Sequence, residues 1–228
     1  MNSGSVHNEA AAGQPGQTGS AILVMAKAPE AGRVKTRQCP PLTFEQARDL
    51  HEALLLDTLD LVRAAATVRM LACAGPPDWF DTHAPDFERF AQQGADLGER
   101  LHAALQAVLA AHTPVLCVGS DSPHISAGCF ERAFFLLQTH PVVLGPARDG
   151  GYYLVGLRTY HDLFRGMPMS TDRLFAATLE RCRELDLEVG LLDVAGDFDT
   201  WQDVCDQAHL LADGHTRRLL AQLSIRPK

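Results

Sequence analysis

The fold of this chain is decided by the stretch VLCVGSDSP, residues 115–123. Its four leading apolar residues predict a short buried strand, and Gly119 and Pro123 then break the run. Asp121 therefore stands at the C-terminal end of a strand, where ligands bind in an open α/β sheet. A carboxylate at that point is suited to hold a hard metal ion through oxygen. The alternative is a strand end whose aspartate only accepts hydrogen bonds within a turn.

The composition is that of an ordinary globular protein. The chain has 228 residues, 46% hydrophobic and 21% charged, which fits one large α/β domain or two small ones. The net charge of −8 argues against a general nucleic-acid-binding surface. No apolar run approaches the ~20 residues that a membrane helix needs, and the N-terminus lacks a signal-peptide pattern. The six cysteines are scattered without a C-x-x-C pair, which predicts reduced thiols and a cytoplasmic protein.

The first 19 residues differ in composition from the rest. They are rich in Gly, Ser, Gln and Ala and have almost no large apolar side chain. Such a segment buries too little surface to offset the entropy of ordering it. We therefore expect a disordered tail over residues 1–19, followed by a single domain over residues 20–228.

Strand and helix patterns alternate along that domain. Apolar runs predict strands at 21–26, 68–74, 87–92, 115–118, 141–146, 152–157 and 187–194. Helical spacing predicts helices at 43–65, 99–111, 126–139, 170–185 and 201–212, with Thr43 and Gln46 as a capping box and Ser170 as a cap. The expected fold class is therefore an α/β three-layer sandwich with a mostly parallel, Rossmann-like central sheet.

A basic loop follows the first predicted strand. Lys27, Arg33, Lys35 and Arg37 fall within eleven residues, and Gly32 lets the backbone turn tightly. Loops at this position line the ligand crevice of α/β sheets, which favours a phosphate site over a merely solvated loop. The loop is neither a P-loop nor a dinucleotide-binding fingerprint, because the glycine spacings of both are missing.

Further carboxylates follow other predicted strands. Asp149 precedes Gly150 and Gly151, whose N–H groups are expected to stay open to an anion or a sugar; a simple hairpin turn is the alternative. Asp197 and Asp199 follow the last strand, where capping of the next helix is their alternative role.

Parallel strands end at one edge of a sheet, so the loops between them should meet there. The loops concerned are 27–37, 93–98, 119–123 and 195–200, with Asp149 beside them. They combine cations, carboxylates and glycines. Mg²⁺ in proteins takes one or two carboxylates together with substrate phosphates. The expected ligand is therefore a metal-bridged phosphate compound.

Five motifs, in this order, resemble those of one known family. They are AKAP at 26–29, GRVKTR at 32–37, GSDSP at 119–123, GPARDGGYY at 145–153 and DFDT at 197–200. The set is similar to that of the glycosyltransferase-A-like bacterial family of nucleotide-diphospho-sugar transferases. Some members are tied to arsenosugar biosynthesis, and relatives include phospholactate guanylyltransferases. The resemblance covers about residues 21–205 and implies the nucleotide-diphospho-sugar transferase fold, with one glycosyltransferase-A-like domain over residues 20–228.

The resemblance also implies roles for individual residues. Asp121 and Asp199 match the acids that bind the metal, Mg²⁺ or Mn²⁺. The predicted nucleotide-binding residues are Lys27, Gly32, Arg33, Lys35, Arg37, Gln93, Gly94 and Gly119. Those predicted to bind the acceptor are Asp149, Gly150 and Gly151, and those predicted to be catalytic are Lys35, Asp121 and Asp149.

The chain departs from the family pattern at two positions. Members often carry leucine after the Thr-Arg step, where this chain has Gln38. Position 119 is glycine, so Asp121 lacks the second acid of the D-x-D motif of many sugar transferases, which favours nucleotidyl transfer. The expected protein is a Mg²⁺-dependent transferase that uses a nucleoside triphosphate or nucleotide sugar and a small phosphorylated acceptor. Glycosyl transfer from a nucleotide sugar is the close alternative, and a non-catalytic nucleotide-binding protein is a second one.

Overall fold

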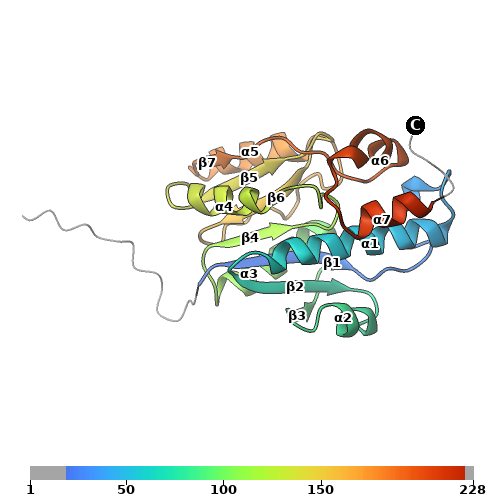
Figure 1. Cartoon of the computed structure of the whole chain (residues 1–228). Coiled ribbons are helices and arrows are strands. Elements are labelled where there is room, and N and C mark those ends of the chain that lie inside the picture. The colour runs from blue at the N-terminus through green and yellow to red at the C-terminus, as the bar shows by residue number, and fades with distance from the viewer. Residues whose placement is uncertain (1–18, 224–228) are drawn as a thin grey trace, which may run out of the picture.

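The structure is a computed structural model that describes residues 19–223. Gly19 apart, the predicted tail of residues 1–19 lies outside the described residues. Within the described range the chain forms a seven-stranded sheet with helices on both faces (Figure 1). The strands are β1 (Ala21–Lys27), β2 (Val68–Ala74), β3 (Glu88–Ala91), β4 (Val115–Val118), β5 (Val142–Pro146), β6 (Tyr152–Leu157) and β7 (Val189–Leu191).

The sheet is mostly parallel, which confirms the predicted fold class. The strand order is β3-β2-β1-β4-β6-β5-β7, and only β6 runs antiparallel to its neighbours β4 and β5. β5 therefore points in the same direction as β1 and β4. Val24 in the middle of β1 pairs with Val118, the last residue of β4, so the loop after β4 runs beside the second half of β1.

Two helical layers cover the sheet. α1 (Phe44–Arg63), α2 (Asp78–His83) and α4 (Ala127–Leu136) pack on one face, and α3 (Leu97–Leu109) and α5 (Leu174–Glu184) on the other. α6 (Trp201–Gln207) and α7 (His215–Gln222) form a third apolar cluster with the first half of α1 (Figure 1). Two 3-10 turns, η1 (Thr36–Gln38) and η2 (Ala208–Leu210), complete the elements. None of the helices described is long and apolar enough to cross a membrane.

Local chemistry explains where α1 begins. The Thr43 side chain accepts a hydrogen bond from the Gln46 N–H, and the Gln46 side chain accepts one from the Thr43 N–H. This reciprocal pair satisfies two N–H groups that a helix start otherwise leaves unpaired. The predicted capping box is thus confirmed.

Other helix ends differ from the prediction. Ser170 does not cap α5, because it has a left-handed φ of 59° and lies four residues before the helix, which begins at Leu174. The predicted final helix ends at Gln207, and η2 follows.

α2 and α7 are not predicted at all. α2 has six residues, too few for a helical period to show. α7 has no side-chain cap of its own; instead the Asp57 carboxylate of α1 accepts hydrogen bonds from the N–H groups of His215 and Thr216.

Candidate functional site

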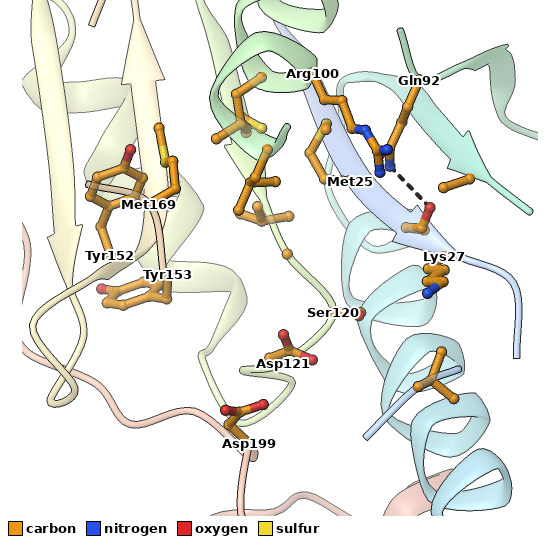
Figure 2. Close-up of a pocket in the computed structure, with 18 of the residues that line it drawn as sticks. Met25, Lys27, Gln92, Arg100, Ser120, Asp121, Tyr152, Tyr153, Met169 and Asp199 are labelled. Carbon is orange, nitrogen blue, oxygen red and sulfur yellow. Dashed lines mark hydrogen bonds between the residues drawn. The ribbon is translucent and has the colours of Figure 1, made fainter. Parts of the chain in front are cut away.

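A cavity of about 460 Å³ lies at the edge of the sheet where β1 and β4 end. Lys27 lines it from the end of β1, Asp121 from the loop after β4, and Asp199 from the segment before α6. Figure 2 shows the two aspartates close together at one end, with Gln92 and Arg100 toward the other. Segments that are distant in the sequence therefore meet here, as expected for a parallel sheet.

The side chain of Lys35 lies between the two carboxylates. Its Nζ is 2.7 Å from Oδ1 of Asp121 and 3.9 Å from Oδ1 of Asp199. The lysine side chain is only 5% exposed, whereas 48% of the Asp121 side chain and 34% of the Asp199 side chain are exposed. The ammonium group therefore partly neutralises a pair of carboxylates that still face the cavity.

The backbone around Lys35 holds its side chain in this position. Lys35 has a left-handed φ of 47°, directly before η1, and its carbonyl oxygen accepts a hydrogen bond from the Gln38 N–H. Gln38 is fully buried, and its Nε2 donates a 2.9 Å hydrogen bond to the Phe198 carbonyl oxygen. Gln38 thus links the turn that carries Lys35 to the segment that carries Asp199. A leucine at this position, as in many family members, could not donate this hydrogen bond.

The two acidic loops are also bonded to each other. The Phe198 N–H donates to the Asp121 carbonyl oxygen at 2.8 Å, and the buried Ser122 hydroxyl donates to the Gly196 carbonyl oxygen at 2.9 Å. These bonds fix the spacing of Asp121 and Asp199 independently of their side chains. The carboxylate pair is therefore a preformed feature of the fold.

Asp199 does not serve as the cap of α6. Thr200 is the N-cap, and its side chain accepts a hydrogen bond from the Asp203 N–H. The Asp199 carboxylate instead accepts a 2.7 Å hydrogen bond from Nη1 of Arg37, whose side chain is 69% exposed. The capping alternative for Asp199 is therefore wrong, and its carboxylate faces two cations.

The carboxyl groups at this edge differ in their pKa values. Burial raises the pKa of Asp121, but the charge and the hydrogen bond of Lys35 together lower it by more than burial raises it. The pKa of Asp121 therefore lies below its ordinary value. Burial, reinforced by the negative charges of Asp149 and other acids, raises the pKa of Asp197 to about 6. The Asp121 carboxylate is therefore ionised at neutral pH, as a metal ligand must be.

The donor set fits a hard divalent cation. Oxygens of Asp121 and Asp199 already converge on one positive charge, the Lys35 ammonium. Across residues 19–223 no group of three or more His, Cys, Asp or Glu side chains is placed to hold a metal ion. A metal at this pair would need further oxygen ligands, which is the usual arrangement for Mg²⁺ on substrate phosphates.

The predicted basic loop lines the cavity in part. Lys27, Arg33, Lys35 and Gly119 line it, and the ammonium of Lys27 donates a 2.8 Å hydrogen bond to the Arg33 carbonyl oxygen. Arg37 and Gly32 are not lining residues. Gly32 has a φ of 72°, so it contributes a turn that other residues adopt with strain.

The loop after β3 reaches the cavity through residues next to the predicted ones. Gln92 and Arg100 line it, whereas Gln93 and Gly94 do not. Gly94 has a φ of 135°, and its carbonyl oxygen accepts a hydrogen bond from Nε of Arg100. Gly94 therefore shapes the loop and positions Arg100.

The segment after β5 is a tight turn. The Gly150 N–H donates to the Ala147 carbonyl oxygen, and the Gly151 N–H donates to Oδ1 of Asp149 at 2.9 Å. The expectation of open amide groups here is therefore wrong, because both hydrogen atoms are used within the turn. The second oxygen of the exposed Asp149 carboxylate remains available at the same edge of the sheet.

His51 and Tyr152 are further polar residues of the cavity that were not predicted. His51 of α1 is 5% exposed, and its Nε2 donates a 2.9 Å hydrogen bond to the Lys27 carbonyl oxygen. Burial lowers the pKa of His51, so the ring is neutral at pH 7. Tyr152 lines the opposite wall, and its buried hydroxyl has no hydrogen-bond partner within the described chain. The sequence offered one signal for His51: it is a histidine among the apolar residues of the buried face of α1.

Comparison with known proteins identifies a family. A profile of DUF2064, described as "Uncharacterized protein conserved in bacteria", matches residues 55–171. A crystal structure from Desulfovibrio desulfuricans G20, of a protein described as a candidate nucleotide-diphospho-sugar transferase, is 30% identical with a TM-score of 0.83. The match covers 89% of this chain and 94% of the other. No curated protein matches the sequence.

More distant structures share the fold. Rv0371c from Mycobacterium tuberculosis H37Rv, solved in complex with manganese, is 19% identical with a TM-score of 0.52, covering 90% of this chain and all of the other (100%). The 4-diphosphocytidyl-2C-methyl-D-erythritol synthase of Anaerococcus prevotii is 13% identical with a TM-score of 0.55, covering 86% and 96%. These similarities extend over nearly the whole sheet and its helices.

Proposed function

The chain belongs to the DUF2064 family of proteins conserved in bacteria, and for it we propose a divalent-metal-dependent transferase activity. The donor is a nucleoside triphosphate or a nucleotide sugar. Nucleotidyl transfer to a small phosphorylated acceptor is the first candidate reaction.

One observation carries this proposal. A single cation, the Lys35 ammonium, is held against Oδ1 of both Asp121 and Asp199 at the end of a 460 Å³ cavity. The volume is in the range of small-molecule binding sites. Carboxylates that already accommodate one cation suit a metal-bound phosphate chain, and Lys27 and Arg33 in the wall suit its remaining negative charge.

In nucleotidyl transfer, an ionised phosphate oxygen of the acceptor attacks the α-phosphorus of the nucleoside triphosphate in line. The bond from that phosphorus to the bridging oxygen breaks, and pyrophosphate leaves with the electron pair. No proton has to be removed from such an acceptor, so the protein mainly positions the reactants and neutralises charge. A bound Mg²⁺ would contribute charge neutralisation at the phosphates.

The residues divide this work between them. Asp121 and Asp199 would hold the metal, and with the metal in place the Lys35 ammonium would serve the leaving phosphates together with Arg33. Asp149, exposed at the same edge, would orient the acceptor. The buried Gln38 would act as a positioning residue, because its hydrogen bond to the 197–200 segment sets the distance between these groups.

Glycosyl transfer would use the same residues and metal, but the bond that breaks is the one between the sugar and the diphosphate of the donor. The described activity of the Desulfovibrio relative favours this second candidate. A nucleotide-sugar donor would lose its sugar to the acceptor, and the diphosphate that leaves would need the same metal and cations. The arsenosugar-related branch of the resemblance falls under this candidate.

The test is a product assay by mass spectrometry, with nucleoside triphosphates and nucleotide sugars offered to a panel of acceptors with and without Mg²⁺. Pyrophosphate release identifies nucleotidyl transfer, and nucleoside diphosphate release with a glycosylated acceptor identifies glycosyl transfer. Nucleotide binding without any metal-dependent turnover would instead identify a non-catalytic binding protein.

Variants connect that assay to the site. Asp121→Asn and Asp199→Asn should each lower turnover about a hundredfold or more, since a lost metal ligand removes several kcal/mol of transition-state stabilisation. The double variant should be little worse than either single one, because the two acids act as a unit. Asp81→Asn, which breaks an exposed ion pair with Arg89 away from the cavity, is the matched control. Full activity in Asp121→Asn would contradict the assignment.

A further inference from the structure

A second cavity, of about 430 Å³, lies between the start of α4 and the chain that leaves β7. His124, Cys129 and Arg132 line one side of it, and Asp193 and Gly196 line the other. In Figure 1, α4 and β7 lie at the end of the sheet opposite β2 and β3. No residue with a role in the proposed transfer lines this cavity.

The second cavity is rich in positive charge. Arg132 and Arg148 both line it, and neither has a carboxylate within ion-pair distance among the residues that the structure describes. His124 lines it as well, and its buried Nδ1 has no hydrogen-bond partner in the same part of the chain. Asp193 is the one carboxylate among the lining residues. The Arg132 guanidinium lies over the Phe135 ring, 5.4 Å from its centroid. Two guanidinium groups without a carboxylate partner and an imidazole nitrogen without a hydrogen bond in the described chain suit an oxyanion.

Most of the remaining lining is apolar. Leu191, Val194 and Leu210 line it and are exposed by 52%, 60% and 44%. Ser126 begins α4 without a side-chain cap, so the first N–H groups of that ten-residue helix add to the positive field. A ligand with one acidic group and a small apolar part matches this combination.

The ring of Tyr153 separates the two cavities. Tyr153 lines both, and its hydroxyl donates a 3.0 Å hydrogen bond to the Asp193 carbonyl oxygen on the side of the second cavity. Gly145 makes room for the ring, since a Cβ there would lie 2.5 Å from it. Arg148 is next in the chain to Asp149, so the second cavity adjoins the edge at which the transfer is proposed.

We propose that the second cavity binds the acceptor through its acidic group, with Arg132, Arg148 and His124 as the oxyanion-binding residues. This assignment rests on the proposed function, because a transferase needs an acceptor molecule beside the nucleotide. The acid group, a phosphate or a carboxylate, anchors the acceptor and is not the oxygen that attacks the donor, and the apolar side chains of Leu191, Val194 and Leu210 restrict what is attached to it.

The experiment measures binding, without turnover, to the full chain by isothermal titration calorimetry. The probes are phenyl phosphate, benzoate and the neutral benzyl alcohol, each with and without a saturating nonhydrolysable nucleoside triphosphate. Arg148→Gln and Arg132→Gln remove the charges, whereas Arg183→Gln changes a surface arginine that lines neither cavity and serves as the control. Melting temperatures verify that each variant is folded.

We expect one or both anions to bind while benzyl alcohol does not, and the two anions show whether the site prefers phosphate or carboxylate. Arg148→Gln and Arg132→Gln should each weaken anion binding about tenfold, as for a lost charged hydrogen bond. The nucleotide should leave this binding in place, because it occupies the other side of Tyr153.

Three results would overturn the proposal: no binding of either anion, equal binding by the arginine variants and the control, or displacement of the anion by the nucleotide. Nucleotide binding is measured in the same titrations. Absence of anion binding by the wild-type chain with intact nucleotide binding refutes the acceptor site alone, and absence of nucleotide binding refutes the proposed function.

Discussion

Replacing Lys35 by methionine should change metal binding and nucleotide binding in opposite directions. The substitution keeps a long side chain in a space that is 5% exposed, and it removes the charge that lies 2.7 Å from Asp121 and 3.9 Å from Asp199. A metal ion that enters the site would no longer have to displace an ammonium group. A nucleotide, however, would lose a cation that faces its phosphates.

The magnitude follows from the distance. At the 2.7 Å separation of Lys35 and Asp121, two unit charges interact by about 1.5 kcal/mol in water and about 6 kcal/mol at an effective dielectric constant of 20. Asp121 is 48% exposed, so we take a value near the lower end, about 2 kcal/mol. Lys35→Met should therefore tighten Mn²⁺ binding to the free protein by about tenfold or more. Nucleotide affinity should fall by about 1–3 kcal/mol.

Both affinities can be read by titration calorimetry on the same preparations, with Mn²⁺ alone and with nucleotide in the presence of Mn²⁺. Lys27→Met is the matched control, because Lys27 lines the same cavity but bonds to a backbone carbonyl instead of a carboxylate. It should leave the affinity for Mn²⁺ alone nearly unchanged. Unchanged or weaker Mn²⁺ binding by Lys35→Met would refute the idea that the ammonium occupies the metal position.

Three further predictions concern the framework of the site and the surface. Gln38→Ala should lower the free energy of unfolding by about 1–3 kcal/mol in urea denaturation, because the buried Phe198 carbonyl oxygen loses its donor; no change would mean that this hydrogen bond is replaced. Gly150→Ala should lower the melting temperature by several degrees, since a Cβ there would lie 2.1 Å from a backbone oxygen at a φ of 88°; a melting curve like that of the wild type would contradict that geometry. The hydrogen bond from Arg63 lowers the pKa of Asp86 to about 2, so this carboxylate stabilises the fold above its unfolded pKa near 4 and the stabilisation is lost as the pH falls toward 2. Asp86→Asn should therefore cost about 1 kcal/mol at pH 7 and progressively less in acid, whereas a pH-independent cost would assign the effect to packing.

Most of the sheet could be predicted because its central strands β1, β4, β5 and β6 are nearly continuous apolar runs. Residues 115–118 are all buried, so the strand shows in the sequence without any tertiary information. The convergence of the loops followed from topology alone. Asp121 could therefore be placed at the ligand edge of the sheet before any coordinate was known.

The features that the sequence did not predict depend mainly on contacts between residues that are distant in the chain. α7 begins where Asp57 of another helix supplies the cap. The amide groups of Gly150 and Gly151 were expected to be open, but a turn closes over them. The position of Lys35 between two carboxylates depends on a left-handed backbone and on Gln38, and no local pattern shows either.

The central claim is that Asp121 and Asp199 together hold one divalent metal that carries the nucleotide phosphates. Its most direct test is the anomalous difference density of a crystal soaked with Mn²⁺ and a nonhydrolysable nucleoside triphosphate. The account predicts one manganese peak within coordination distance of oxygens from both carboxylates and from the phosphates, with the Lys35 ammonium moved off Asp121. A manganese bound without either carboxylate, or no manganese at saturating concentration, would contradict it.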